Sequence, residues 1–96
     1  MAATLSDAEI AERLGALSAW RHEGSAIVAE VQLADFAAAI ALVDRVAEVA
    51  EAANHHPDIL VHDYRLLRLT LSTHSVGGLT HADLDLAAQL DGLLRG

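Results

Sequence analysis

The sequence predicts an α+β fold in which three helices cover one face of a four-stranded antiparallel sheet. Segments with helical caps and helical spacing of apolar residues alternate with pairs of short strand-like segments, in the order α-β-β-α-β-β-α. The links inside each pair are too short for a parallel crossover, which favours antiparallel pairing and a sheet with one covered face. With 96 residues the chain corresponds to one domain, residues 1–96, with a single small core.

Two of the helices are predicted from capping boxes. Ser6 can accept a hydrogen bond from the backbone of Glu9 while the Glu9 side chain reaches back to Ser6. Thr80 and Asp83 repeat this spacing before the leucines at the end of the chain, and here Asp83 is interpreted as a helix cap. The predicted helices are residues 7–17 and about 80–94.

A long helix is predicted between these two, beginning at the capping residue Asp35 and ending near Asn54. Apolar residues recur along it at helical spacing, which predicts a stripe that faces the core. The stripe consists of Phe36, Ile40, Val43, Val46, Ala47 and Ala50.

The strands are predicted from short β-like runs on either side of the long helix. Gly24-Ser25 occupies a two-residue hairpin position between the first two runs. In the last run Leu67, Leu69 and Leu71 alternate with more polar residues, so one face belongs to the core. The predicted strands are residues 19–23, 26–32, 58–62 and 65–73.

Charge and composition exclude several classes of function. The formal net charge is −8, which argues against direct contact with nucleic acid phosphates. The chain lacks cysteine, which excludes disulfides and thiolate chemistry. Residues 1–6 contain neither a basic segment nor a long apolar run, so we expect a cytoplasmic protein without a signal peptide or membrane contact.

The densest group of titratable side chains is the run Asn54-His55-His56-Pro57. Pro57 disfavours helical geometry at the preceding residue, so the helix ends near Asn54 and the histidines lie on extended chain. Successive side chains of an extended segment point in opposite directions, which predicts different roles for His55 and His56. Glu51 lies one helical turn before His55 and can reach it, where its carboxylate would favour the charged ring. Glu51 equally fits a solvated helix face.

A second polar group, Ser72-Thr73-His74, follows the last strand, and the turn Gly77-Gly78 comes next. If the last two strands are neighbours, His74 can approach the two adjacent histidines beside a small pocket bordered by the glycines. Imidazoles are suited to proton transfer near neutral pH. Taken alone, the three histidines are as compatible with a structural group as with a site of proton transfer. A metal site is less favoured, because the side chains of adjacent histidines diverge. The other three, His22, His62 and His81, are interpreted as surface residues.

The combined motifs resemble the pterin-4a-carbinolamine dehydratases. The resemblance rests on residues 51–58, with the sequence Glu-Ala-Ala-Asn-His-His-Pro-Asp, on Ser72-Thr73-His74, and on Gly78-Leu79-Thr80 with Asp83 beyond. It extends roughly over residues 20–90, which is most of the domain.

This resemblance implies removal of water from a 4a-hydroxytetrahydropterin to give quinonoid dihydropterin in tetrahydrobiopterin recycling, without a metal or an organic cofactor. It implies His55 and His74 as acid/base candidates, His56 chiefly as a substrate-binding residue, and Glu51 as the carboxylate partner. The implied substrate-binding residues are Asn54, His55, His56, Ser72, Thr73, His74 and Ser75.

The partners expected are the pterin substrate and other copies of the chain. The aromatic-poor core and the small residues of the long helix favour a homodimer or homotetramer, as in relatives of this family, and recycling implies a functional link to an aromatic amino-acid hydroxylase. Two alternatives remain: a non-enzymatic dimerisation or coactivator-type module that binds protein through a helical surface, and a simple histidine metal-binding domain.

Overall fold

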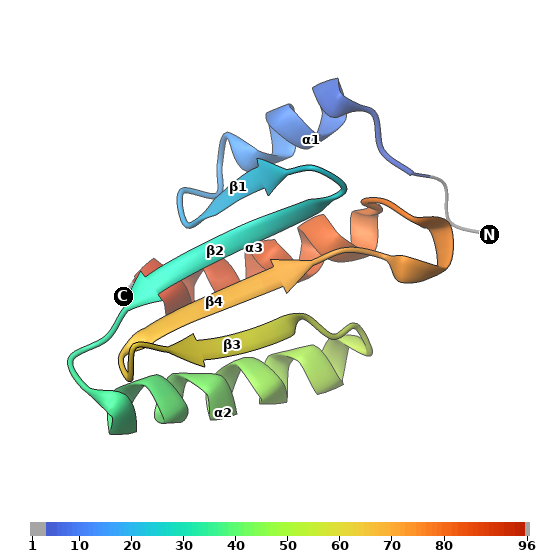
Figure 1. Ribbon diagram of the computed structural model, residues 1–96. Helices are drawn as coiled ribbons and strands as arrows, with labels where there is room; N and C mark the ends of the chain where they lie inside the picture. The colour runs from blue at the N-terminus through green and yellow to red at the C-terminus, as the bar shows by residue number, and fades with distance from the viewer. Residues whose placement is uncertain (1–3, 96) are drawn as a thin grey trace.

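The computed structural model describes residues 4–95, and the predicted α+β class and order of helices and strands are confirmed (Figure 1). One short 3₁₀ turn, η1, was not predicted. The elements are α1 (Asp7–Leu14), β1 (Trp20–Glu23), β2 (Ala26–Gln32), α2 (Phe36–Ala53), β3 (Asp58–His62), β4 (Leu66–Leu71), η1 (His74–Val76) and α3 (His81–Arg95). Within this part of the chain, no helix is long and apolar enough to cross a membrane.

The four strands form one sheet in the order β1-β2-β4-β3, and each neighbouring pair is antiparallel. Ala29 at the centre of β2 is opposite Trp20 on one side and Leu69 on the other, and Leu69 is in turn opposite Ile59. Because β3 and β4 are antiparallel neighbours, the start of β3 and the end of β4 lie at the same end of the sheet. The chain entering β3 therefore lies near the chain leaving β4 (Figure 1). This brings the two histidine-containing segments to one end of the domain.

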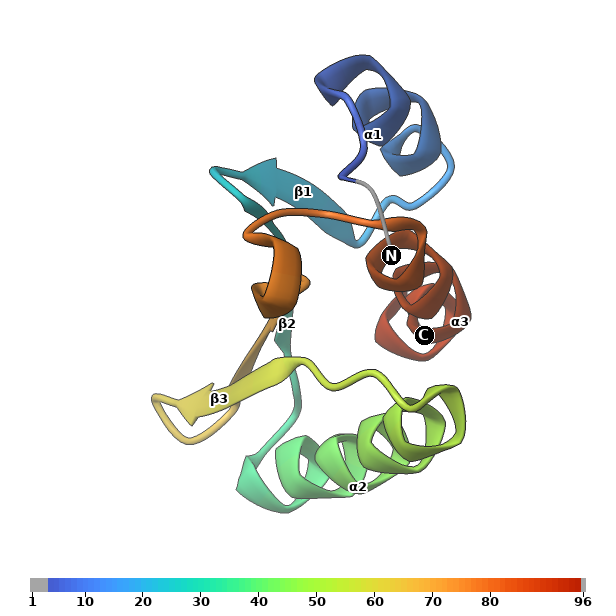
Figure 2. The ribbon, with the colours of Figure 1, turned by 90° about the vertical axis from the view of Figure 1, so that its right-hand side faces the viewer.

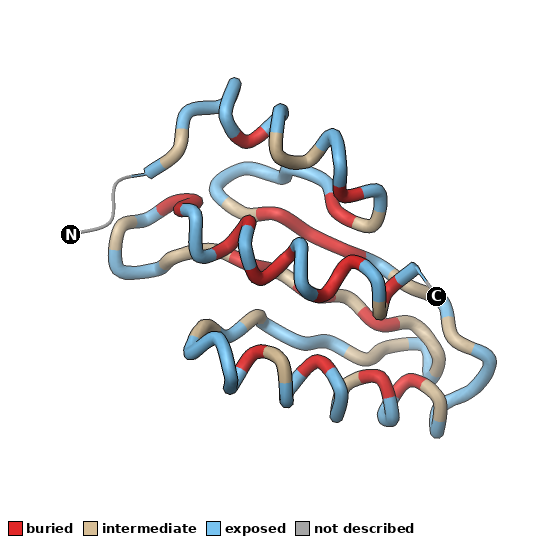
Figure 3. The backbone as a smooth tube through the Cα atoms, turned by 180° about the vertical axis from the view of Figure 1, so that it is seen from behind, coloured by how far each residue is buried: buried red, intermediate tan, exposed pale blue. Residues whose placement is uncertain are grey.

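All three helices lie on one face of the sheet, as predicted (Figure 2). Alternate residues of β4 are buried, and they share one core cluster with residues of β2 and of α3, whose buried residues occur along its length in Figure 3. This alternation fits a sheet with one covered face. The largest fully buried core side chains are Ile27, Leu67, Leu69, Leu71, Leu84, Leu86 and Leu90.

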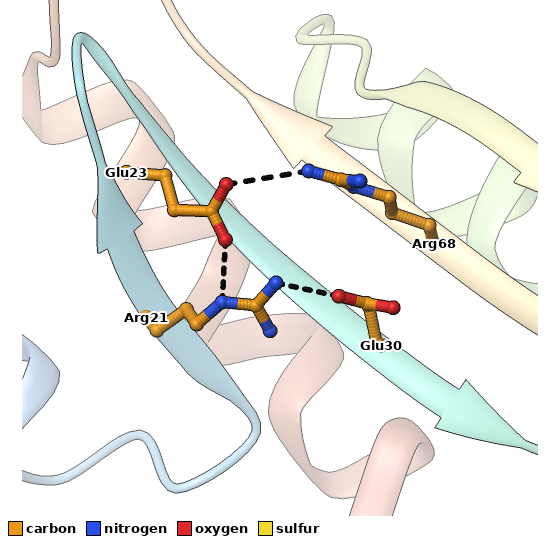
Figure 4. A network of polar contacts seen from close by, with 4 residues as sticks. All are labelled: Arg21, Glu23, Glu30 and Arg68. Atoms are coloured by element: carbon orange, nitrogen blue, oxygen red, sulfur yellow. Dashed lines mark hydrogen bonds and ion pairs between the residues drawn. The ribbon is translucent and has the colours of Figure 1, made fainter.

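The opposite face of the sheet carries a network of four charged side chains (Figure 4). Arg21 contacts Glu23 and Glu30, each at 2.5 Å, and Arg68 contacts Glu23 at 3.3 Å. The hydrogen bond from Arg21 lowers the pKa of Glu30, so any stabilisation from this exposed pair is present near neutral pH and is lost as acid protonates Glu30. Val28, opposite Arg21 on β2, is only 2% exposed although no described helix covers this face.

The predicted bounds were wrong at the ends of two elements. The first helix stops at Leu14, where Gly15 is the C-cap, and Leu17 is reached through a tighter turn in which its N–H bonds to the Leu14 carbonyl. The fourth strand stops at Leu71, and the residues predicted to continue it enter the η1 turn.

The predicted core stripe of α2 was partly wrong. Val46 and Ala50 are buried as predicted, but Phe36 is 54% and Ile40 is 38% exposed, and Ala47 is exposed. α2 lies at one side of the helical layer beside α3 and β3, so the domain covers only part of its apolar surface (Figure 2). The residues of α2 that are buried are Ala39, Leu42, Val46 and Ala50.

Candidate functional site

The site begins at the carboxyl end of α2, where the chain leaves the helix through a left-handed turn. Asn54 has φ 52° and ψ 40°. Its N–H bonds to the Glu51 carbonyl and the N–H of His55 bonds to the Ala50 carbonyl, which is the hydrogen-bond pattern of a Schellman cap. Pro57 then keeps the chain extended. The turn therefore sets the direction in which the two histidines leave the helix.

We expect substitutions at Asn54 to separate its backbone role from any role of its side chain. Asn54→Gly keeps the left-handed turn at little cost, whereas Asn54→Ala should lower the free energy of unfolding by up to about 1 kcal/mol because alanine disfavours positive φ. Urea unfolding of both variants measures this difference. If the amide binds substrate, both variants should also raise KM, and Asn54→Gly will do so without loss of stability.

His55 contacts a buried carboxylate on another helix. Its Nε2 lies 2.6 Å from Oδ1 of Asp83, and the His55 side chain is only 19% exposed while that of Asp83 is fully buried. Asp83 lies in the first turn of α3, so this contact joins the end of α2 to the start of α3. A buried carboxylate in this position fixes the orientation of the imidazole ring.

The same carboxylate organises the segment after β4. Oδ2 of Asp83 accepts hydrogen bonds from Oγ1 of Thr73 at 2.7 Å and from the N–H of Thr80 at 2.9 Å. The second of these is the cap predicted from sequence. The two threonine hydroxyls lie 2.9 Å apart, and because Thr73 donates to Asp83, Thr80 is the donor to Thr73. His55, Asp83, Thr73 and Thr80 thus form one connected polar network.

His56 has a separate carboxylate partner. Its Nε2 lies 2.5 Å from Oε2 of Glu51, and both side chains are exposed. The predicted contact between Glu51 and His55 was therefore wrong, because the left-handed residue Asn54 ends the helical spacing on which it depended. The prediction that His55 and His56 point in different directions is confirmed by their different partners.

His74 begins the η1 turn and, like Ser75, is exposed. The turn is closed by Thr73, whose N–H bonds to the Gly78 carbonyl at 2.9 Å. Thr73 also contacts Asp83, so it belongs to the network that holds His55. His74 is the next residue in the sequence after Thr73. Ser72 instead donates its hydroxyl to the Ser25 carbonyl of the β1–β2 turn at 2.9 Å.

Gly77 and Gly78 border a cavity of about 190 Å³, but the cavity lies on the side of the amino-terminal segment. Its lining includes Leu5, His22 and Ser25 and does not include His55, His56 or His74. A Cβ on Gly78 would lie 3.1 Å from Cγ2 of Thr4, so glycine allows the segment to pack there. This cavity is therefore not the pocket predicted between the glycines and the three histidines.

Sequence reasoning assigned Asp83 only a capping role and missed its contact with His55. The cap signal was correct but gave no indication that the second carboxylate oxygen contacts a histidine just beyond the end of α2. Across residues 4–95, no group of three or more His, Asp or Glu side chains is arranged to hold a metal ion. What the described side chains can do is transfer protons, with each of two histidines supported by its own carboxylate.

Comparison with known proteins gives a consistent result. The family model described as pterin 4 alpha carbinolamine dehydratase matches residues 3–93. Provisionally named pterin-4-alpha-carbinolamine dehydratases from Roseiflexus castenholzii and Nocardia farcinica are 54% and 56% identical, covering 98% and 95% of this chain and 100% and 95% of their own. The crystal structure of a transcriptional coactivator/pterin dehydratase from Brucella melitensis matches with a TM-score of 0.87 and 30% identity, over 96% of this chain and 99% of that one.

Proposed function

Because the chain belongs to the pterin-4-alpha-carbinolamine dehydratase family, we propose that it catalyses the dehydration of 4a-hydroxytetrahydropterin to quinonoid dihydropterin by histidine acid/base chemistry. The observation that carries this proposal is the contact between His55 and buried Asp83, which also binds Thr73 next to His74. This contact orients one imidazole, and the bond from Thr73 to the same carboxylate links it to the segment that carries His74 at the same end of the sheet.

The reaction requires two proton transfers. An acid protonates the 4a oxygen, the C4a–O bond breaks, and water leaves. A base takes the proton from N5, and the electron pair of the N–H bond forms the C4a=N5 double bond. Because hydroxide is a poor leaving group, protonation of the oxygen is the step that most needs an acid. We assign these transfers to His55 and His74, and the binding and orientation of the substrate to His56 supported by Glu51.

The remaining proposed substrate contacts come from the two segments at this end of the sheet. Asn54 precedes the histidines, and exposed Ser75 follows His74 in η1. Ser72 and Thr73 use their hydroxyls within the protein, which leaves them to shape the site rather than to donate hydrogen bonds to the ligand. The proposed setting is tetrahydrobiopterin recycling in the cytoplasm beside an aromatic amino-acid hydroxylase.

The direct test is an assay of the purified protein with 4a-hydroxytetrahydropterin, in the presence and absence of a chelator. We expect faster formation of quinonoid dihydropterin than in buffer, at an unchanged rate with chelator. A rate equal to that of the uncatalysed reaction would contradict the proposed enzyme. Activity that disappears with the chelator would favour the metal-binding alternative.

A second role in protein contact is favoured by the apolar surface that α2 leaves exposed. Phe36 and Ile40 lie one helical turn apart on α2, and exposed Ala47 continues this surface. An exposed apolar helix face is typical of a protein interface. We propose that α2 contributes to self-association into a homodimer or homotetramer, and the same surface could serve a coactivator-type partner.

We expect the double substitution Phe36→Asp and Ile40→Asp to weaken self-association by placing two charges in the proposed interface. Light scattering at micromolar concentration should show a smaller assembly for this variant than for the wild type. The control is the double substitution Ala8→Asp and Ala11→Asp, which adds the same two charges at exposed positions of α1, on the other side of α3 from α2 (Figure 2). A wild-type monomer, or an equal effect of the control, would contradict the proposed interface.

A further inference from the structure

We infer that Asp83 is a positioning residue which holds His55 in the tautomer that acts as the base of the proposed dehydration. The inference rests on the proposed function for the reaction itself, but the positioning can be tested without it. It also divides the two proton transfers, since it assigns removal of the N5 proton to His55.

The hydrogen bonds of Asp83 make it an acceptor toward His55. Its side chain is fully buried, and both oxygens are engaged: Oδ2 accepts from Thr73 and Thr80, and Oδ1 contacts His55. A carboxylate removed from water needs such partners. It also lies in the first turn of α3, where a negative charge is favoured. Asp83 therefore acts as an acceptor at Oδ1, and the hydrogen in the 2.6 Å contact belongs to Nε2 of His55.

The hydrogen on Nε2 determines which nitrogen of the His55 ring can act as a base. A neutral imidazole has one N–H and one lone pair, so a hydrogen on Nε2 places the lone pair on Nδ1. Nδ1 can then accept the N5 proton of the carbinolamine. The positive charge that develops on the ring is stabilised by the Asp83 carboxylate, which is the arrangement by which a buried aspartate supports a histidine base. The base thus keeps the correct tautomer before substrate binds.

His56 also contacts a carboxylate, but in a more exposed setting than His55. Its contact with Glu51 is as short, at 2.5 Å, but both side chains are exposed, so water screens the interaction and competes for the same atoms. A contact between a histidine and a carboxylate is therefore a weak constraint on the ring of His56 and a strong one on the ring of His55.

Thr73 belongs to this positioning system. A hydroxyl has one hydrogen, and Thr73 donates it to Asp83 while accepting from Thr80. Thr73 therefore orients the carboxylate instead of donating to the substrate. Removing its hydroxyl should loosen Asp83 and, through it, His55, while the cap from Thr80 N–H to Asp83 stays in place.

The experiment combines dehydratase kinetics with nitrogen NMR of the histidine rings in Asp83→Asn, Thr73→Val and Thr73→Ser. In Asp83→Asn the amide oxygen is held by Thr73 and Thr80, so the amide N–H faces His55 and forces the hydrogen of the ring onto Nδ1. We expect kcat to fall by about 10²–10⁴-fold with this change of tautomer. Thr73→Val should lower kcat by about tenfold, whereas Thr73→Ser, which keeps the hydroxyl, should have a kcat close to that of the wild type.

Asp85→Asn is the matched control, because Asp85 lies on the exposed side of α3 and contacts Arg13 instead of the site. It should keep the wild-type kcat and the Nε2–H tautomer of His55. Positioning by Asp83 is overturned if wild-type His55 carries its hydrogen on Nδ1, or if folded Asp83→Asn keeps the wild-type tautomer. The base role is overturned if that variant changes the tautomer but not kcat. A wild-type protein without dehydratase activity would overturn the proposed function and the base role together, while the tautomer would still decide the positioning.

Discussion

Replacing His55 with alanine is expected to lower kcat for dehydration of the 4a-carbinolamine by about 10²–10⁴-fold, the usual contribution of a general acid or base. The imidazole is removed while Asp83 keeps its hydrogen bonds from Thr73 and Thr80, so α3 remains capped and the fold should persist. The rate of formation of quinonoid dihydropterin measures the loss. His74→Ala should lower kcat by a similar factor, whereas His56→Ala should act chiefly on KM.

His62→Ala is the control for these substitutions. His62 lies at the far end of β3, where it contacts Asp63, and it takes no part in the proposed site. Circular dichroism and thermal unfolding should show that each variant is folded. A folded His55→Ala protein with the kcat of the wild type would contradict the assignment of His55, and a loss of activity in His62→Ala would indicate an indirect effect.

The local signals in the sequence were sufficient for most of the architecture. The capping box of Ser6 and Glu9 is present with both of its hydrogen bonds, and Asp35 caps α2 through the N–H of Ala38. The alternation in β4 correctly placed Leu67, Leu69 and Leu71 in the core. These features depend on residues a few positions apart, which is why they can be predicted from one sequence.

The carboxylate partners of the histidines could not be predicted in the same way. The contact between His55 and Asp83 joins residues 28 positions apart, and it exists because α2 ends where α3 begins in space. Helical spacing instead predicted Glu51 as the partner of His55. The left-handed conformation of Asn54 changes the direction of the chain, and Glu51 contacts His56 instead. Sequence reasoning therefore selected the candidate histidines, but the carboxylate partners of His55 and His56 are given only by the three-dimensional structure.

The apolar stripe of α2 illustrates a different limit. Helical spacing identifies an apolar surface but does not say what covers it. Phe36 and Ile40 belong to that surface and are exposed, whereas Ala39 and Leu42, which lie on a different side of the helix, are buried. The pattern is explained if part of the stripe serves the core of the domain and the rest serves contact with another chain.

The largest loss of stability is expected from Leu69→Ala. Leu69 lies in the centre of β4, fully buried between Ala29 on β2 and Ile59 on β3. Its truncation removes apolar contacts and leaves a cavity, which typically lowers the free energy of unfolding by about 2–5 kcal/mol. A domain of this size has roughly 5–15 kcal/mol in total, so much of the stability should be lost. Urea unfolding followed by circular dichroism measures the change.

Leu60→Ala is the matched control, because Leu60 is on the same pair of strands but 51% exposed on the opposite face of the sheet. Its truncation should change the free energy of unfolding by no more than about 0.5 kcal/mol. An equal loss in both variants would contradict the placement of the core on the helical face. Both should be measured at two protein concentrations, because association adds stability that depends on concentration. A loss in Leu60→Ala that varies with concentration would instead place Leu60 in a contact between chains made by the edge strand β3.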